Sequence, residues 1–287
     1  YTKLDANGNE LPDNAPWLWA MVRDNVTGLI WEVKTDDGSI HDMDNAYTWE
    51  RAMEFGTTLN SLNFGGYPGW RLPTIKELSQ LVDSIKPSGP TINTDYFPNT
   101  QPSLHWSSTV KTGNPNAAWC FSFGTSTVNA WDVTRNRSIM AVRGEPSSNY
   151  FVDNADGTIT DTSTGLMWQQ ATAPGTYSWQ QALSYCENLT IDEYDDWGLP
   201  NRNELQTLVD YNVSGPSINT DYFPNTTAYY YFSSTTAADW PQGFWGVFFD
   251  AGVVYDYSKL TVPYPYLRCV RGAALVDSDA DGIPEDG

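Results

Sequence analysis

Carboxylates alternate along the last eleven residues of the chain. Asp277, Asp279 and Asp281 stand at every second position, Gly282 follows, and Glu285 comes shortly after. Side chains at this spacing can wrap a hard cation through oxygen ligands, which are the ligands that Ca²⁺ takes in proteins. A calcium site is one prediction for this tail and a solvated acidic linker is the other, because such loops usually come in series. No other cofactor is expected.

Residue types that are typical of catalysis are sparse. The only histidines are His41 and His105, and the chain has no motif of a serine hydrolase, a zinc protease or a phosphate-binding loop. Glu77 and Glu204 could act as acids, but each follows a Thr or an Asn by three residues. That is the spacing of a helix-capping box and predicts a structural role. The sequence therefore argues against an enzyme.

The chain contains a tandem duplication. The segment SGPTINTDYFPNT at 88–100 returns at 214–226 with one Thr-to-Ser exchange, and shorter motifs recur in the same order on both sides of it. A period of roughly 126 to 137 residues is too long for a solenoid repeat and lets each copy bury its own core. We therefore predict a lead-in at 1–19, domains at 20–145 and 150–273, and a tail at 274–287.

The two copies, compared with each other, indicate the elements that must position any site. Alternating apolar residues around Asp-Gly and Thr-Gly turns predict a β-hairpin at 151–168. One helix is predicted to start at Thr48 or Ser178, and a second one has Thr74 or Asn201 as its N-cap. Short strands and loops rich in Ser, Thr, Asn and aromatic residues follow. Each domain is therefore predicted as α+β, with a β-hairpin, two helices and a twisted antiparallel sheet.

Two of the three cysteines are predicted to form a disulfide. Cys186 lies on the apolar face of a predicted helix and Cys269 near the end of the second copy, whereas the first copy has Gly56 and Ala141 there. Joint presence in one copy and joint absence in the other is what a disulfide produces, and two unrelated buried thiols are the alternative. Cys120 has no obvious partner and is expected to be a small core residue.

The ordered motifs resemble the bacterial Lcl C-terminal domain family. They are Thr-Gly-Leu-x-Trp, Trp-x-Leu-Pro-x-x-x-Glu-Leu, Ser-Ser-Thr and, in the second copy, a closing Arg-Cys-Val-Arg. The resemblance covers roughly 20–145 and 150–273. It implies a C-type-lectin-like fold, related to formylglycine-generating enzymes and to the variable proteins of diversity-generating retroelements, and a secreted or cell-surface location. The first copy departs from the pattern because it lacks both cysteines.

In C-type-lectin-like folds the late loops and strands meet the ligand, and there the two copies differ most. Free drift of loops would yield Ser, Gly and charged residues, whereas these segments carry many Tyr and Trp residues. Such rings stack on sugars or anchor peptide side chains. The predicted ligand-binding residues are Trp119, Trp131, Arg135, Arg137, Trp245, Tyr255, Tyr257, Tyr264 and Tyr266.

Composition limits the class of partner. The net charge of −20 disfavours nucleic acid and anionic membranes, whose binding needs clustered Lys and Arg. No segment approaches the roughly 20 apolar residues that span a bilayer, so membrane insertion is not expected. We predict an extracellular bacterial binding module, adhesin-like or receptor-like, for carbohydrate or a protein surface. The alternatives are a structural spacer of a larger surface protein and, with less support, an enzyme of the formylglycine-generating type.

Overall fold

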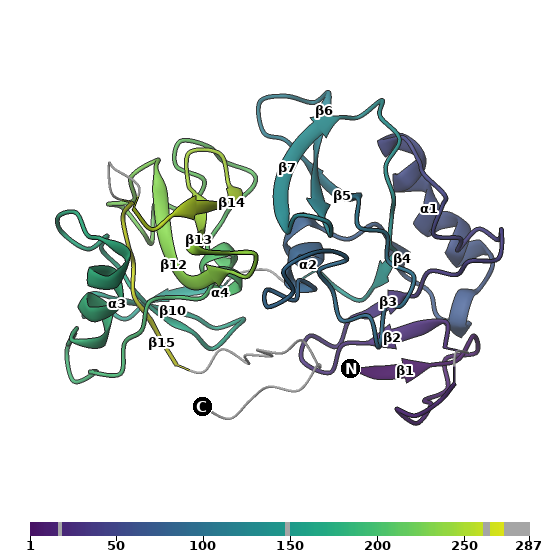
Figure 1. Cartoon of the computed structure of the whole chain (residues 1–287), viewed down its shortest axis with the longest axis horizontal. Coiled ribbons are helices and arrows are strands. Elements are labelled where there is room, and N and C mark those ends of the chain that lie inside the picture. The colour runs from purple at the N-terminus through teal and green to yellow at the C-terminus, as the bar shows by residue number, and fades with distance from the viewer. Residues whose placement is uncertain (17–18, 147–149, 261–264, 273–287) are drawn as a thin grey trace. The chain divides into compact units, whose positions relative to one another are not determined.

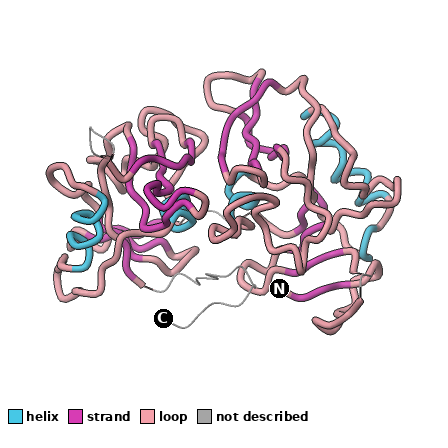
Figure 2. Tube along the Cα trace, in the orientation of Figure 1, coloured by secondary structure: helices cyan, strands magenta, loops and turns pink. Residues whose placement is uncertain are grey.

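The chain forms two compact units. The computed structural model describes residues 1–16, 19–146, 150–260 and 265–272; the first unit ends at Pro146 and the second is described from Tyr150 (Figure 1). Each unit combines antiparallel strands with two α-helices (Figure 2). The predicted α+β class and the tandem arrangement are therefore confirmed.

The first unit has a sheet that includes the start of the chain. Its first strand comes from the predicted lead-in and pairs antiparallel with the second, with Leu4 opposite Met21. Both side chains are buried, so residues 2–4 form an integral edge strand. In sheet order the strands are β1 (Thr2–Leu4), β2 (Met21–Arg23), β3 (Ile30–Glu32), β8 (Val142–Arg143) and β4 (Trp70–Arg71).

The second unit repeats this sheet with one strand fewer. The segment predicted as a single hairpin at 151–168 contributes three strands, because the Asp-Gly turn and the Thr-Gly turn each join a separate antiparallel pair. The prediction is corrected accordingly, from a hairpin to a meander. In sheet order the strands are β15 (Val270–Arg271), β11 (Met167–Gln169), β10 (Thr158–Asp161) and β9 (Phe151–Asp153).

The segment that both copies share almost unchanged, 88–100 and 214–226, packs against the first residues of its own copy. The ring of Tyr1 lies 5.2 Å from Tyr96 and 5.6 Å from Phe97, measured between centroids. In the second unit the ring of Phe151 lies 5.2 Å from Phe223 in the same way. The conserved Tyr-Phe pair is therefore scaffold, since it packs against the first residues of its own copy.

Capping residues set the starts of three of the four α-helices that the described residues form. Side chain and backbone exchange both hydrogen bonds of a capping box at Thr74, Ser178 and Asn201, as predicted. Glu77, inside the first box, also pairs with the Arg71 guanidinium at 2.6 Å, which confirms its structural role. The helices are α1 (Trp49–Ser61), α2 (Ile75–Gln80), α3 (Trp179–Glu187) and α4 (Arg202–Thr207), with a short 3₁₀ helix at Phe64–Gly66.

Each unit also contains a three-stranded antiparallel meander built from its later residues. The indole N–H of Trp49 donates to the Ser107 carbonyl, and that of Trp179 to the Ser233 carbonyl, so the first helix of each unit packs against the meander in the same way. The strands are β5 (Leu104–Val110), β6 (Ala117–Ser122) and β7 (Thr127–Asp132) in the first unit, and β12 (Tyr230–Ala237), β13 (Trp240–Phe248) and β14 (Val253–Ser258) in the second.

The predicted disulfide is confirmed. Cys186 on α3 is bonded to Cys269, which directly precedes β15, while Cys120 is a buried free thiol. In the first unit a Cβ added to Gly56 would lie 2.5 Å from the Trp70 carbonyl oxygen. Helix α1 therefore lies so close to β4 that no side chain fits, and the two units fasten their first helix in different ways.

Candidate functional site

Two of the predicted ligand-binding rings belong to the core. Trp119 is 3% exposed and Trp245 is 7% exposed, and the Arg202 guanidinium lies 5.2 Å from the Trp245 ring. A ring with so little surface cannot stack on a ligand. The prediction for these two residues is therefore corrected, because their strands turn them toward the interior.

In the first unit the structure brings together two of the predicted residues. Trp131, at the end of β7, is 43% exposed, and the Arg137 guanidinium lies 5.2 Å from its ring centroid, a cation–π distance. Arg135 is exposed in the turn that follows β7, where its amide N–H donates to the Asp132 carbonyl. These residues thus present an exposed indole with a cation over it.

Five predicted residues lie outside the part of the chain that the structure describes. They are Tyr264, Asp277, Asp279, Asp281 and Glu285. Among the residues that are described, no group of three or more His, Cys, Asp or Glu side chains is arranged to hold a metal ion.

In the second unit four rings share one side of the meander, and the rings of Tyr229 and Tyr266 adjoin them; we call these six the aromatic face. Tyr230 of β12 stands opposite Phe248 of β13 in the strand register, and their rings stack at 4.4 Å. The Tyr257 ring lies 4.4 Å from Tyr230. Because side chains alternate along a strand, Tyr255 points to the same side as Tyr257. The members are Tyr229, Tyr230, Phe248, Tyr255, Tyr257 and Tyr266.

A glycine in the central strand makes room for these rings. Gly246 pairs with Tyr255 across the β13–β14 register. A Cβ at this position would lie 3.0 Å from the Phe244 ring and 3.2 Å from the Tyr257 ring. The absence of a side chain therefore lets neighbouring rings lie over the strand. The first unit has Cys120 here.

The aromatic face is a property of the second unit alone. The strand registers of the two meanders match position by position, and the first unit has a single ring, Trp131, among the corresponding residues. Those residues are Ser103, Leu104, Ser122, Asn129, Trp131 and Ser138. The two copies therefore share the scaffold and differ at this surface, which has one ring in the first unit and six in the second.

The aromatic face is accessible and carries no formal charge. Tyr255 is 39% exposed, and the other five rings are half-buried. Burial raises the pKa of Tyr257, and the neighbouring Tyr230 raises it further. That phenol is therefore protonated at neutral pH and donates a hydrogen bond. A surface of this kind can stack on apolar faces and bond to hydroxyls or carbonyls.

Sequence reasoning did not assign Phe248 to the site, although its ring stacks on Tyr230 near the centre of the face. The signal that could have identified it is strand alternation, because Phe244, Gly246 and Phe248 share one side of β13. Pairing that strand with Tyr255 and Tyr257 places Phe248 on the same surface.

Comparison with known proteins adds one finding. A model of the family described as the Lcl C-terminal domain matches residues 20–143 and again residues 157–271. No curated protein matches the chain. Within the described ranges, every helix is too short or too polar to cross a lipid bilayer.

Proposed function

Because the chain belongs to the Lcl C-terminal domain family in both of its halves, we propose that it is a tandem ligand-binding module of the bacterial surface or extracellular space. Each unit is proposed to have the C-type-lectin-like fold that the sequence motifs imply. The observation that carries the proposal is the aromatic face of the second unit. Its ligand is carbohydrate or a protein surface.

The distribution of aromatic residues favours binding over a spacer role. A spacer has no use for six adjoining rings at positions where the other copy has one ring, Trp131, among Ser, Leu and Asn residues. Rings left partly in water cost solubility, and exposed apolar patches usually mark interaction sites. Tyr is also a low-entropy contact residue, because few torsions must be fixed when it binds.

The chemistry of the aromatic face favours binding over catalysis. Its members are five phenols and one phenyl ring, and it has no carboxylate, imidazole or thiol among them. Since the chain carries a net charge of −20, a polyanionic ligand is disfavoured. The disulfide between Cys186 and Cys269 supports the extracellular proposal, because such bonds persist in oxidising compartments.

A glycan array with the full chain tests the proposal, and one substitution locates the site. Tyr255→Asn places on β14 the residue that the first unit has as Asn129, so the strand should accept it. A contact ring of this kind commonly carries about 1 to 3 kcal/mol, so we expect affinity to fall by roughly fivefold to 150-fold.

The matched control is Tyr150→Ala, which removes a ring that is 67% exposed and lies outside the aromatic face. It should bind like the parent chain. Binding by Tyr255→Asn at parental affinity would place the site elsewhere. If neither glycans nor protein ligands bind the parent chain, the spacer interpretation is favoured.

A further inference from the structure

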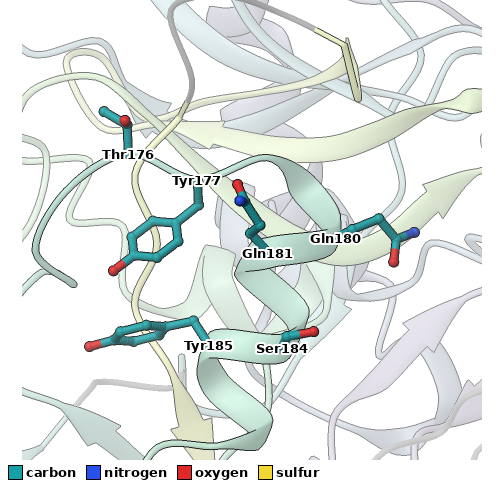
Figure 3. Close-up of a pocket in the computed structure, with 6 residues that line it drawn as sticks. All are labelled: Thr176, Tyr177, Gln180, Gln181, Ser184 and Tyr185. Carbon is teal, nitrogen blue, oxygen red and sulfur yellow. The ribbon is translucent and has the colours of Figure 1, made fainter.

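A second candidate surface lies on helix α3 of the same unit. It is a hollow of about 470 Å³, and Figure 3 shows two tyrosine rings projecting from one side of the helix and from the loop before it. We propose that this hollow binds one ring of a neutral sugar. The inference rests on the proposed function and adds to it a ligand class and a separate binding site. The lining residues are Thr176, Tyr177, Gln180, Gln181, Ser184 and Tyr185.

The two rings are held in place by hydrogen bonds from outside the hollow. Their centroids are 5.1 Å apart and the ring planes are tilted by 57°. The Tyr177 hydroxyl donates to the Pro174 carbonyl at 2.5 Å, and the Gln169 amide donates to the Tyr185 hydroxyl at 3.3 Å. A site whose aromatic walls are already fixed loses little entropy when a ligand binds.

The capping box leaves part of one amide available to a ligand. The carbonyl oxygen of Gln181 accepts the Ser178 backbone N–H at 2.8 Å. That bond engages only the acceptor end of the side chain, and the amide N–H₂ supplies two donors. Gln180 and Ser184 are exposed on the same helix. The rings can therefore contact the C–H face of a pyranose while amides and hydroxyls bond to its hydroxyl groups.

Charge selects a neutral ligand. The hollow has two phenols, two amides and two hydroxyls, and neither a carboxylate nor a cation. The matching positions on α1 include Glu50, Arg51 and Glu54, and the Lys34 ammonium lies 5.3 Å from the ring of Phe55. The second copy therefore lacks the charges that the first copy carries on this surface. An anionic sugar would find no cation to pair with in the hollow.

The probes are methyl glycosides of glucose, galactose, mannose and N-acetylglucosamine, titrated at millimolar concentration into the full chain and followed by ¹H–¹⁵N NMR. We expect at least one of them to shift the amide signals of residues 176–185. Ser184→Glu, which installs the side chain found at Glu54, should weaken that binding by about tenfold or more, since it fills the hollow and adds a charge. Glu187→Gln, on the same helix outside the hollow, should bind like the parent.

Two results would overturn the inference. One is that no glycoside shifts these amide signals, and a result in which a peptide shifts them and no glycoside does counts as the same outcome. The other is that Ser184→Glu binds as well as the parent chain, provided that its spectrum shows a folded protein.

The Tyr255→Asn variant separates this inference from the proposed function, because it should leave glycoside binding in the hollow unchanged. Glycan binding that depends on Tyr255 and not on Ser184 keeps the proposed function and refutes the sugar site on α3. Glycoside binding that depends on Ser184 and not on Tyr255 supports the hollow.

Discussion

Replacing Glu32 with Gln should destabilise the first unit by about 3 to 5 kcal/mol. The Glu32 side chain is buried and lies 3.0 Å from the Lys34 ammonium, itself buried, and 2.8 Å from Nδ1 of His41. Burial alone would raise the pKa of Glu32, but Lys34 and His41 together with the Ala141 amide N–H hold it below its ordinary value. The carboxylate is therefore charged, and its loss leaves an ammonium in the interior without a counterion.

The size of the loss has an upper limit. A buried ammonium without a partner can release its proton, and for a lysine of ordinary pKa, about 10.4, this costs about 5 kcal/mol at pH 7. The lower figure corresponds to the loss measured when one partner of a buried pair is removed. Both figures are a large part of the stability of a single domain.

The second unit supplies the control. At the same positions it has Gln169, whose side-chain oxygen accepts the Cys269 amide N–H, and Ala171. The double substitution of Glu32→Gln with Lys34→Ala introduces the same two side chains and removes the buried ammonium, so it should recover most of the lost stability. Hydrogen exchange of peptides from 20–143 in a urea series measures the first unit by itself. The reasoning is refuted if the free energy of unfolding of Glu32→Gln lies within about 1 kcal/mol of the parent value, or if the double variant is less stable than Glu32→Gln.

Three further predictions concern pH, the disulfide and the tail. Burial lowers the pKa of His105 to about 4, below the ordinary value near 6.5, so the unfolded chain binds a proton that the folded chain does not. The first unit should therefore lose about 3 kcal/mol of stability as the pH falls from 6.5 to 4. Urea titrations at several pH values measure this loss, and a stability that does not change with pH contradicts it. Reducing the Cys186–Cys269 disulfide, which joins residues 83 apart, should lower the stability of the second unit by about 4 kcal/mol and leave that of the first unit unchanged. Urea unfolding midpoints of each unit, measured with and without reductant, test this prediction. Removing residues 277–287, or adding a chelator, should leave both melting temperatures nearly unchanged in calorimetry, and a large drop would show an integral calcium site.

Local signals and the duplication made much of the fold predictable. The starts of α2, α3 and α4 follow from capping residues at Thr74, Ser178 and Asn201, because a capping box needs only residues three apart. The disulfide followed from comparing the two copies. The edge strand at 2–4 was not predicted, since three residues are too few to show a periodicity.

The candidate site was only partly predictable, because it depends on strand register. Every residue of β6 is buried, so alternation in the sequence could not show which way Trp119 points. The pairing of β12 with β13, which places Phe248 beside Tyr230, is a contact between distant segments and has no local signal. The hollow on α3 likewise depends on how the loop before the helix folds back against it.

In each copy the first and the last strand belong to one sheet, and this arrangement affects how copies can be added during evolution. In the first unit β1 and β8 are separated by two strands, and in the second β9 and β15 are separated by two. With neighbouring strands about 4.8 Å apart, the chain enters and leaves each copy within roughly 15 Å. A whole copy can therefore be added by duplication or removed by deletion without changing the fold of the neighbouring copy. Evolution can then vary the number of copies separately from the surface that each copy presents.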